Sequence, residues 1–243
     1  MNLHLVSFGA PKKKYASTKN KFHNEALNLE VFKSINIFSD NDFNNYPDLK
    51  EHENYCKNTP KIFGNGLWKW YLILKIMKEI PKNEIISYVD IGCTFNKFGI
   101  DRICDYYNIV NEKDNLSFSL PYPEAMFTKM DTYRKVFPYS DEHFYSKHIL
   151  SGIIFLKNTV KNQEIIEELK SLSIENEHHY INDNPSVLKN DPIFSSHRHD
   201  QSIFSLMNKK YNFFSIPDET YWHPNWDIDG KKYPIWATRN VPR

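Results

Sequence analysis

The sequence has 243 residues, of which 40% are hydrophobic and only 7 are glycine, a composition that suits one globular domain and argues against a fibrous or low-complexity protein. The net charge of +1 gives no strong positive electrostatic potential, so nucleic-acid binding is not expected. The 3 cysteines lack CxxC spacing and no apolar run reaches the length of a membrane span, which argues against a disulfide framework and a transmembrane protein.

The first part of the chain predicts alternating strands and helices: a strand at 3–8, a helix from Thr18 to about Phe32, a strand at 35–38 and an irregular helix at 42–54. Thr18 is placed to cap the first helix. The clearest helix spans residues 67–80, where Leu67, Trp70 and Leu74 share one face and Pro81 follows the end. A helix this apolar is expected to be mostly buried.

Residues 85–89 form a near-continuous apolar run, which is typical of a central parallel strand covered on both faces. Asp90 follows the carboxyl end of this strand, the edge at which open α/β sheets bind ligands. Further elements are expected downstream: strands at 116–120 and 152–156, a helix at 163–172, a surface loop at 176–192, a helix at 202–210 and a strand at 213–216. This alternation predicts an α/β fold with a mainly parallel central sheet flanked by helices.

Several common catalytic motifs are missing from the sequence. There is no Gly-x-x-x-x-Gly-Lys loop, no Gly-x-Gly-x-x-Gly after the first strand and no Gly-x-Ser-x-Gly elbow. Their absence disfavours P-loop NTPases, dinucleotide-dependent dehydrogenases and serine hydrolases.

The first positive signal is the segment Asp90-Ile91-Gly92-Cys93. A strand-end carboxylate can anchor Mg²⁺ or Mn²⁺ beside a diphosphate, and Gly92 lets the backbone approach a ligand. An Asp that only caps the following turn is an equally good interpretation of the spacing.

The second signal is the polar segment His197-Arg198-His199-Asp200-Gln201-Ser202 at a helix start. Asp200 either caps this helix or orients and deprotonates an acceptor hydroxyl. A zinc site on His197 and His199 is disfavoured because no third ligand stands at a suitable spacing.

The C-terminal part is rich in aromatic residues that suit stacking on a sugar or a base, although a single Trp more often closes a core. Trp222 and Trp226 are candidate acceptor contacts, with Gly152 at the start of a strand. His223 is a candidate metal ligand or diphosphate contact, and Arg239 a candidate phosphate ligand through its planar guanidinium.

Segments in the same order make the sequence resemble a family of small GT-A-type glycosyltransferases of bacterial capsule or lipopolysaccharide clusters and of some large DNA viruses. The matching segments are Gly64–Trp70, Asp90–Cys93, Thr128–Asp131, Ser151–Lys157, His197–Ser205, Pro217–Thr220 and Trp236–Arg239. The resemblance departs at Trp70-Tyr71, where the family has Trp-Lys-Pro, and at Gly92, where the Asp-x-Asp metal motif has its second aspartate.

This resemblance implies a single GT-A (Rossmann-like) domain over residues 1–243, with a donor half at about 1–95 and an acceptor half at about 96–243. It implies a nucleotide-sugar donor, a glycan or lipid-linked glycan acceptor and a divalent metal, Mn²⁺ or Mg²⁺, on Asp90, for which His223 is the candidate second ligand. Asp200 and Arg239 are the expected catalytic residues, and Gly152, Trp222 and Trp226 the expected acceptor contacts. The expected donor contacts are Ser7, Phe8, Gly9, Lys69, Asp90, Gly92, Arg198 and Gln201.

The sequence therefore predicts a cytoplasmic enzyme that transfers a sugar to a hydroxyl of a capsule- or lipopolysaccharide-type glycan. Any membrane contact is expected to be peripheral, at the inner face, and Lys12-Lys13-Lys14 is a candidate for it, although such a run is usually a solvated turn. The alternatives are a non-catalytic glycan-binding module and a metal-assisted hydrolase of nucleotide sugars.

Overall fold

The computed structural model describes residues 1–10, 14–59 and 61–238. The strands are β1 (Leu3–Phe8), β2 (Ser34–Phe38), β3 (Ile85–Val89), β4 (Thr94–Phe95), β5 (Asn115–Pro123), β6 (Lys147–Ile149), β7 (Ile153–Lys157), β8 (Ser215–Pro217) and β9 (Ile235–Trp236). The α-helices are α1 (Lys14–Leu27), α2 (Pro47–Lys50), α3 (Glu53–Asn58), α4 (Ile62–Asn65), α5 (Trp68–Glu79), α6 (Ile100–Lys113), α7 (Glu124–Phe127), α8 (Met130–Val136), α9 (Val160–His178) and α10 (Asp200–Lys210). Two 3₁₀ turns, η1 (Asp40–Asn45) and η2 (Lys97–Gly99), complete the elements of the described residues.

The central sheet has seven strands in the order β2-β1-β3-β7-β5-β6, with β8 paired to β5. β1 pairs in parallel with β2 and β3, and β8 pairs in parallel with β5. β7 runs antiparallel to both β3 and β5, and β6 runs antiparallel to β5. Five of these seven described strands therefore point one way, so the prediction of an α/β fold with a mostly parallel sheet is confirmed.

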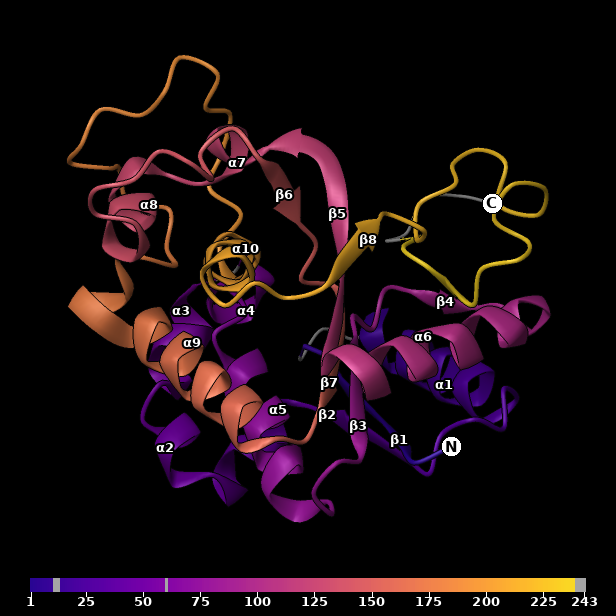
Figure 1. Cartoon of the computed structure of the whole chain (residues 1–243). Coiled ribbons are helices and arrows are strands. Elements are labelled where there is room, and N and C mark those ends of the chain that lie inside the picture. The colour runs from indigo at the N-terminus through magenta and orange to yellow at the C-terminus, as the bar shows by residue number, and fades with distance from the viewer. Residues whose placement is uncertain (11–13, 60, 239–243) are drawn as a thin grey trace.

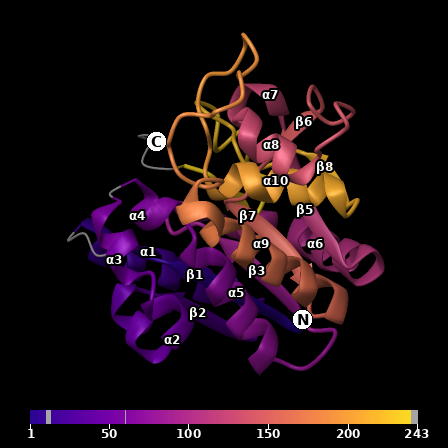
Figure 2. The same cartoon turned by 90° about the vertical axis from the view of Figure 1, so that its left-hand side faces the viewer.

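Helices cover both faces of the sheet (Figures 1 and 2), with α5 and α9 on one side and α1 and α6 on the other. Successive side chains of a strand point to opposite faces of the sheet, so one buried strand contributes side chains to the core on each face. In β3, Ile86 and Tyr88 join the core under α5 and α9, whereas Ile85 and Val89 join the core under α1 and α6. The apolar run that predicted a doubly covered strand is thereby explained.

The helix predicted at 67–80 is α5, and its burial is confirmed because Trp70 has 0% of its surface exposed and Trp68 has 5%. The prediction for α1 was wrong at both ends. The helix begins before Thr18, which therefore lies inside it and is no cap, and it ends at Leu27 rather than at Phe32. The chain must turn there because Lys33 N already donates to Leu3 O at 2.7 Å, and Glu30 makes the turn with φ 54°.

The sequence-based prediction omitted α6, although its signal was present. Ile103, Tyr106 and Val110 are spaced three and four residues apart and are all buried, as expected for one helical face. The loop predicted at 176–192 is largely confirmed, since α9 becomes irregular at Glu175 and the chain continues as a loop to His199. In the part of the chain that the structure describes, no helix has the length and apolar character to cross a bilayer.

Candidate functional site

A cleft of about 780 Å³ lies at the carboxyl ends of β1 and β3. Phe8 and Ala10 border it at the end of β1, and Asp90 and Gly92 border it after β3. The segment 196–201 at the start of α10 forms the opposite wall. The cleft thus opens at the sheet edge at which Asp90 was expected to meet a ligand.

A buried ion pair forms the floor of the cleft. The Lys69 ammonium donates to the Asp200 carboxylate, and the Ser151 hydroxyl donates to the same carboxylate oxygen at 2.8 Å. Lys69 also donates to the Ser151 backbone carbonyl at 3.0 Å, and its side chain is only 3% exposed. The pair is well satisfied by hydrogen bonds, as a buried charge pair must be.

This arrangement corrects one interpretation of Asp200. The N-cap of α10 is His199 and Asp200 is the first helical residue, so Asp200 is not the cap of the helix. Its carboxylate instead points to Lys69 and Ser151, which come from α5 and from the segment before β7. Three elements far apart in sequence therefore hold one carboxylate at the cleft.

Asp90 is the more open of the two cleft carboxylates, with 35% of its side chain exposed. The Tyr88 hydroxyl donates to Asp90 Oδ1 at 2.8 Å, and Lys69 Nζ lies 3.8 Å from the same oxygen. Burial, together with the neighbouring Asp90, raises the pKa of Tyr88 well above its usual value, so the hydroxyl stays protonated. Asp90 N donates to Gly152 O at 2.8 Å, which fixes the turn after β3 against β7.

The two histidines of the opposite wall differ in what they can still bind. His197 Nε2 donates to Tyr180 O at 3.0 Å and its Nδ1 accepts from Lys129 N at 3.3 Å, so both nitrogens are used. His199 Nδ1 lies 2.9 Å from Ile181 O and 2.8 Å from Asn65 Nδ2, and His199 Nε2 lies 3.6 Å from Asp183 Oδ1. Burial lowers the pKa of both rings, and both are neutral at pH 7.

Two buried nitrogen atoms in this wall have no hydrogen-bond partner among the described protein atoms: His199 Nε2 and Gln201 Nε2. The first belongs to an imidazole and donates or accepts according to its tautomer, whereas the second is an amide donor. Both residues line the cleft, and His199 holds the uncommon backbone conformation φ 57°, ψ −124°. Unsatisfied buried polar groups and backbone strain both concentrate at functional sites.

An aromatic wall closes the side of the cleft next to β1. The Phe8 and Trp68 rings stack with centroids 4.0 Å apart, and Phe63 stacks on Phe8 at 6.0 Å. Phe63 belongs to a run of positive φ angles from Ile62 to Gly66, a left-handed turn just before α5. This turn presents Ile62 and Phe63 to the cleft.

Positive charge surrounds the cleft. Lys57 and Lys61 line it from α3 and from the residue before α4, and Arg198 lines it from the opposite wall. The Arg198 guanidinium lies 3.8 Å above the Phe127 ring, which is a cation–π contact.

The structure brings most of the predicted donor residues together. The cleft is lined by six of them, Phe8, Lys69, Asp90, Gly92, Arg198 and Gln201, and by Asp200, which was predicted as a catalytic residue. Ser7, Gly9 and Gly152 neighbour lining residues in the chain without lining the cleft, and Ser7 Oγ donates to Val89 O at 2.6 Å. Arg239 lies outside the described residues.

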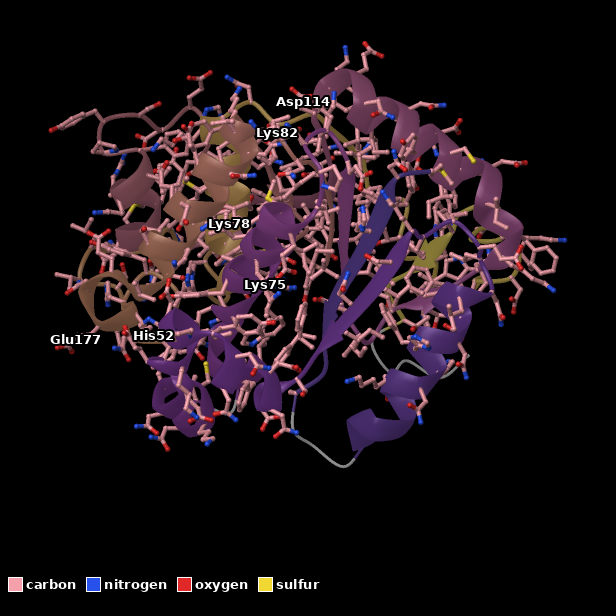
Figure 3. All side chains as sticks on the ribbon, turned by 90° about the horizontal axis from the view of Figure 1, so that it is seen from below. His52, Lys75, Lys78, Lys82, Asp114 and Glu177 are labelled. Carbon is pink, nitrogen blue, oxygen red and sulfur yellow. The ribbon has the colours of Figure 1, made fainter. Side chains whose placement is uncertain are left out.

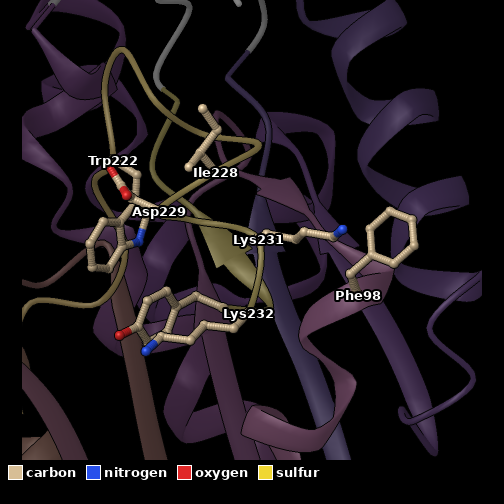
Figure 4. Close-up of a pocket in the computed structure, with 7 residues that line it drawn as sticks. Phe98, Trp222, Ile228, Asp229, Lys231 and Lys232 are labelled. Carbon is tan, nitrogen blue, oxygen red and sulfur yellow. The ribbon is translucent and has the colours of Figure 1, made fainter.

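The predicted acceptor aromatics lie elsewhere. Trp222 lines a separate groove of about 800 Å³ with Phe98, Ile228 and Tyr233 (Figure 4), and its ring stacks on Tyr233 at 4.6 Å. Trp226 is 2% exposed and packs 6.0 Å from Trp236, so it presents no face to a ligand in this structure.

The residues around Asp90 are poorly arranged for the predicted divalent metal. His223 does not line the cleft with Asp90, and in residues 1–10, 14–59 and 61–238 no three His, Cys, Asp or Glu side chains are placed to hold a metal. Asp200 is engaged by Lys69, and the Lys69 ammonium beside Asp90 would repel a second cation. At an effective dielectric constant of about 20, unit charges about 4 Å apart interact by about 4 kcal/mol. The two carboxylates therefore suit the Lys69 ammonium that lies between them better than a divalent ion. A metal on Asp90 and His223 stays a prediction.

Other lining residues were not in the predicted site, among them Lys57, Lys61, Trp68, Tyr88, Ser151 and His199. The sequence pattern could have indicated Tyr88 as a site residue, because it stands two residues before Asp90 and so points to the same face of the sheet. No such pattern indicates Lys57 and Lys61, because surface lysines occur throughout the sequence.

The sequence matches no protein-family model and no curated protein. The fold is similar to that of a glycosyltransferase involved in the glycosylation of the major capsid of PBCV-1, with a TM-score of 0.52, 13% identity and coverage of 99% of this chain and 94% of that one. Mouse xyloside xylosyltransferase 1 aligns with a TM-score of 0.49, 11% identity and coverage of 99% of both chains. The galactosyltransferase LgtC, solved with donor and acceptor sugar analogs, aligns with a TM-score of 0.48, 8% identity and coverage of 96% of this chain and 86% of that one. At 13% identity the likeness to the first of these structures concerns the fold alone, which is of the GT-A type.

Proposed function

We propose that this protein is a glycosyltransferase that moves a sugar from a nucleoside diphosphate sugar to a hydroxyl of an acceptor glycan. The observation that carries the proposal is a pair of buried nitrogens, His199 Nε2 and Gln201 Nε2, that lack a hydrogen-bond partner among the described protein atoms and lie beside the Lys69–Asp200 ion pair. A buried polar group without a partner costs about 1–3 kcal/mol. A sugar hydroxyl both donates and accepts, so it can bind an imidazole nitrogen of either tautomer as well as an amide donor.

The rest of the cleft suits the other parts of such a donor. Its volume of about 780 Å³ is within the usual range for a small-molecule site. The stacked wall of Phe8 and Trp68 suits a flat nucleobase. Lys57, Lys61 and Arg198 suit the negatively charged diphosphate.

In the proposed reaction, the bond between the anomeric carbon and the diphosphate oxygen breaks, and the bonding pair leaves with the nucleoside diphosphate. The acceptor oxygen forms the new bond to that carbon, and its proton is released to the solvent. The Asp200 carboxylate, fixed by Lys69 and Ser151, positions the sugar at the floor of the cleft. Cleft cations stabilise the negative charge that develops on the leaving group.

The acceptor is proposed from the sequence resemblance alone, as a capsule- or lipopolysaccharide-type glycan. Ser151 lines the cleft next to Gly152, so an acceptor that enters there reaches the Asp200 carboxylate.

Turnover of a panel of nucleotide sugars, with and without a panel of glycan acceptors, tests the proposal. Release of nucleoside diphosphate that requires an acceptor, with the sugar recovered on the acceptor by mass spectrometry, is the expected result. Release without an acceptor would identify a hydrolase of nucleotide sugars instead. Glycan binding with no turnover of any donor would identify a non-catalytic binding module.

A further inference from the structure

The charges of the cleft are unbalanced in favour of cations. Among the described residues that line it, the cationic ones are Lys57, Lys61, Lys69 and Arg198, and the carboxylates are Asp90 and Asp200, which gives the lining a net charge of +2 with the histidines neutral. Glu53 and Asp183, which pair with Lys57 and Lys61, lie outside the lining. The two neutral histidines are His197 and His199, whose pKa values are lowered by burial. A diphosphate, with a negative charge on each phosphate, therefore meets compensating charge that the chain itself supplies.

The carboxylates are also poorly arranged for a divalent ion. Asp200 is 5% exposed in its side chain and accepts from Lys69 and Ser151. Asp90 has one oxygen bound by Tyr88, and residue 92, where a second carboxylate would complete the pair, is glycine. The Lys69 ammonium lies between the two, in contact with Asp200 and 3.8 Å from Asp90 Oδ1.

We propose that this protein binds the donor diphosphate through its own cations and transfers the sugar without a divalent metal, with the Lys69 ammonium occupying the place between the carboxylates. The inference rests on the proposed function and adds how the charge of the donor is neutralised. Lys69 sets the charge of the floor and positions Asp200, and the direct phosphate ligands are Lys57, Lys61 and Arg198.

The ligand lysines are free to change partners. Lys61 pairs with Asp183 at 3.2 Å and Lys57 pairs with Glu53 at 3.0 Å, and more than half of each lysine side chain is exposed. Exposed pairs of this kind are weak, so a phosphate can displace the carboxylate partner at little cost.

Calorimetric binding of a panel of nucleoside diphosphates, measured in EDTA and in Mn²⁺ at equal ionic strength, tests the inference. We expect the tightest ligand to bind with Kd values that agree within about threefold in the two buffers. Affinity should fall steeply as salt rises, because the contacts are between charges. Binding that is at least tenfold weaker in EDTA and is restored by Mn²⁺ would overturn the metal-free inference and leave the proposed function standing. Absence of binding in both buffers would overturn the proposed function, and this inference with it.

Substitutions of the cleft lysines further distinguish diphosphate binding by the protein's own cations from binding by a divalent metal. Lys61→Gln and Lys57→Gln are each expected to weaken nucleoside diphosphate binding about five- to tenfold in EDTA. The matched control is Lys78→Gln, because Lys78 is an exposed lysine of α5 that pairs with Glu167 and does not line the cleft; Figure 3 labels it on the underside of the molecule. Equal effects of Lys61→Gln and Lys78→Gln would contradict the assignment.

Asp90→Asn gives opposite expectations under the two mechanisms. If a metal on Asp90 holds the diphosphate, the variant loses Mn²⁺-dependent binding. If the cations of the chain hold it, removal of a negative charge beside them makes binding in EDTA tighter. Circular dichroism and the melting temperature confirm that the variant is folded.

Discussion

A Cβ atom on Gly66 would lie 2.8 Å from the Asp200 carboxyl carbon, so the glycine before α5 leaves the space that the cleft carboxylate occupies. Gly66 also has φ 81°, a conformation that costs a residue with a side chain about 1–2 kcal/mol. Gly66→Ala is therefore expected to lower the free energy of unfolding by about 2 kcal/mol or more and to displace Asp200. Donor turnover should fall more than stability alone explains. Gly9→Ala is the control, because its Cβ would meet only Ile91 Cγ1, at 4.0 Å; similar losses in both variants would contradict the role given to Gly66.

Removal of one partner of the buried ion pair should be costly. Asp200→Asn leaves the Lys69 ammonium without its carboxylate, and the expected loss is about 3–5 kcal/mol by denaturant unfolding. The double variant Lys69→Met, Asp200→Asn removes the uncompensated charge and should recover part of that stability. Sugar transfer should stay lost in both variants. Recovery of transfer together with stability in the double variant would show that Asp200 serves the fold and not the reaction.

The burial of Trp70 makes it a structural residue. Its ring is 0% exposed and stacks on Phe204 at 5.8 Å, between α5 and α10. Trp70→Ala is expected to cost about 3–5 kcal/mol through the lost contacts and the resulting cavity. Tyr221→Ala, at an aromatic residue that is 52% exposed, should change the melting temperature little. An unchanged melting temperature for Trp70→Ala would contradict the packing described for this face of the sheet.

Stability should fall on acidification below about pH 6.5. Burial lowers the pKa of His197 and His199 in the folded protein, so the unfolded chain binds protons at these rings first as the pH drops. The stabilisation is complete above the unfolded pKa and is lost progressively below it, by up to about 1.4 kcal/mol per pH unit for each ring. His52 and His178 shift in the same direction. Melting temperatures from pH 7.5 to 5.0 measure the slope, which should be smaller in His197→Gln than in the parent protein.

The sequence by itself determined the elements whose side-chain pattern depends only on near neighbours. The apolar run at 85–89 is β3, and the aromatic helix predicted at 67–80 is α5. Both could be predicted because a strand buried on two faces, or a helix buried on most of its surface, has a continuous run of apolar residues. The position of Asp90 at the sheet edge followed from the strand that precedes it. The resemblance of ordered motifs likewise anticipated an α/β fold of the GT-A type.

Only the tertiary structure decided which of these residues meet. Lys69 and Asp200 are 131 positions apart, and nothing in either local segment says that they form one buried pair. The same holds for Lys61, for the buried nitrogens of His199 and Gln201, and for Trp222, which lies in a separate groove. Such contacts arise because the crossovers of the sheet bring the end of β3, the start of α5 and the start of α10 together. Charge, burial and hydrogen bonding at a site are properties of that arrangement, not of the order of residues along the chain.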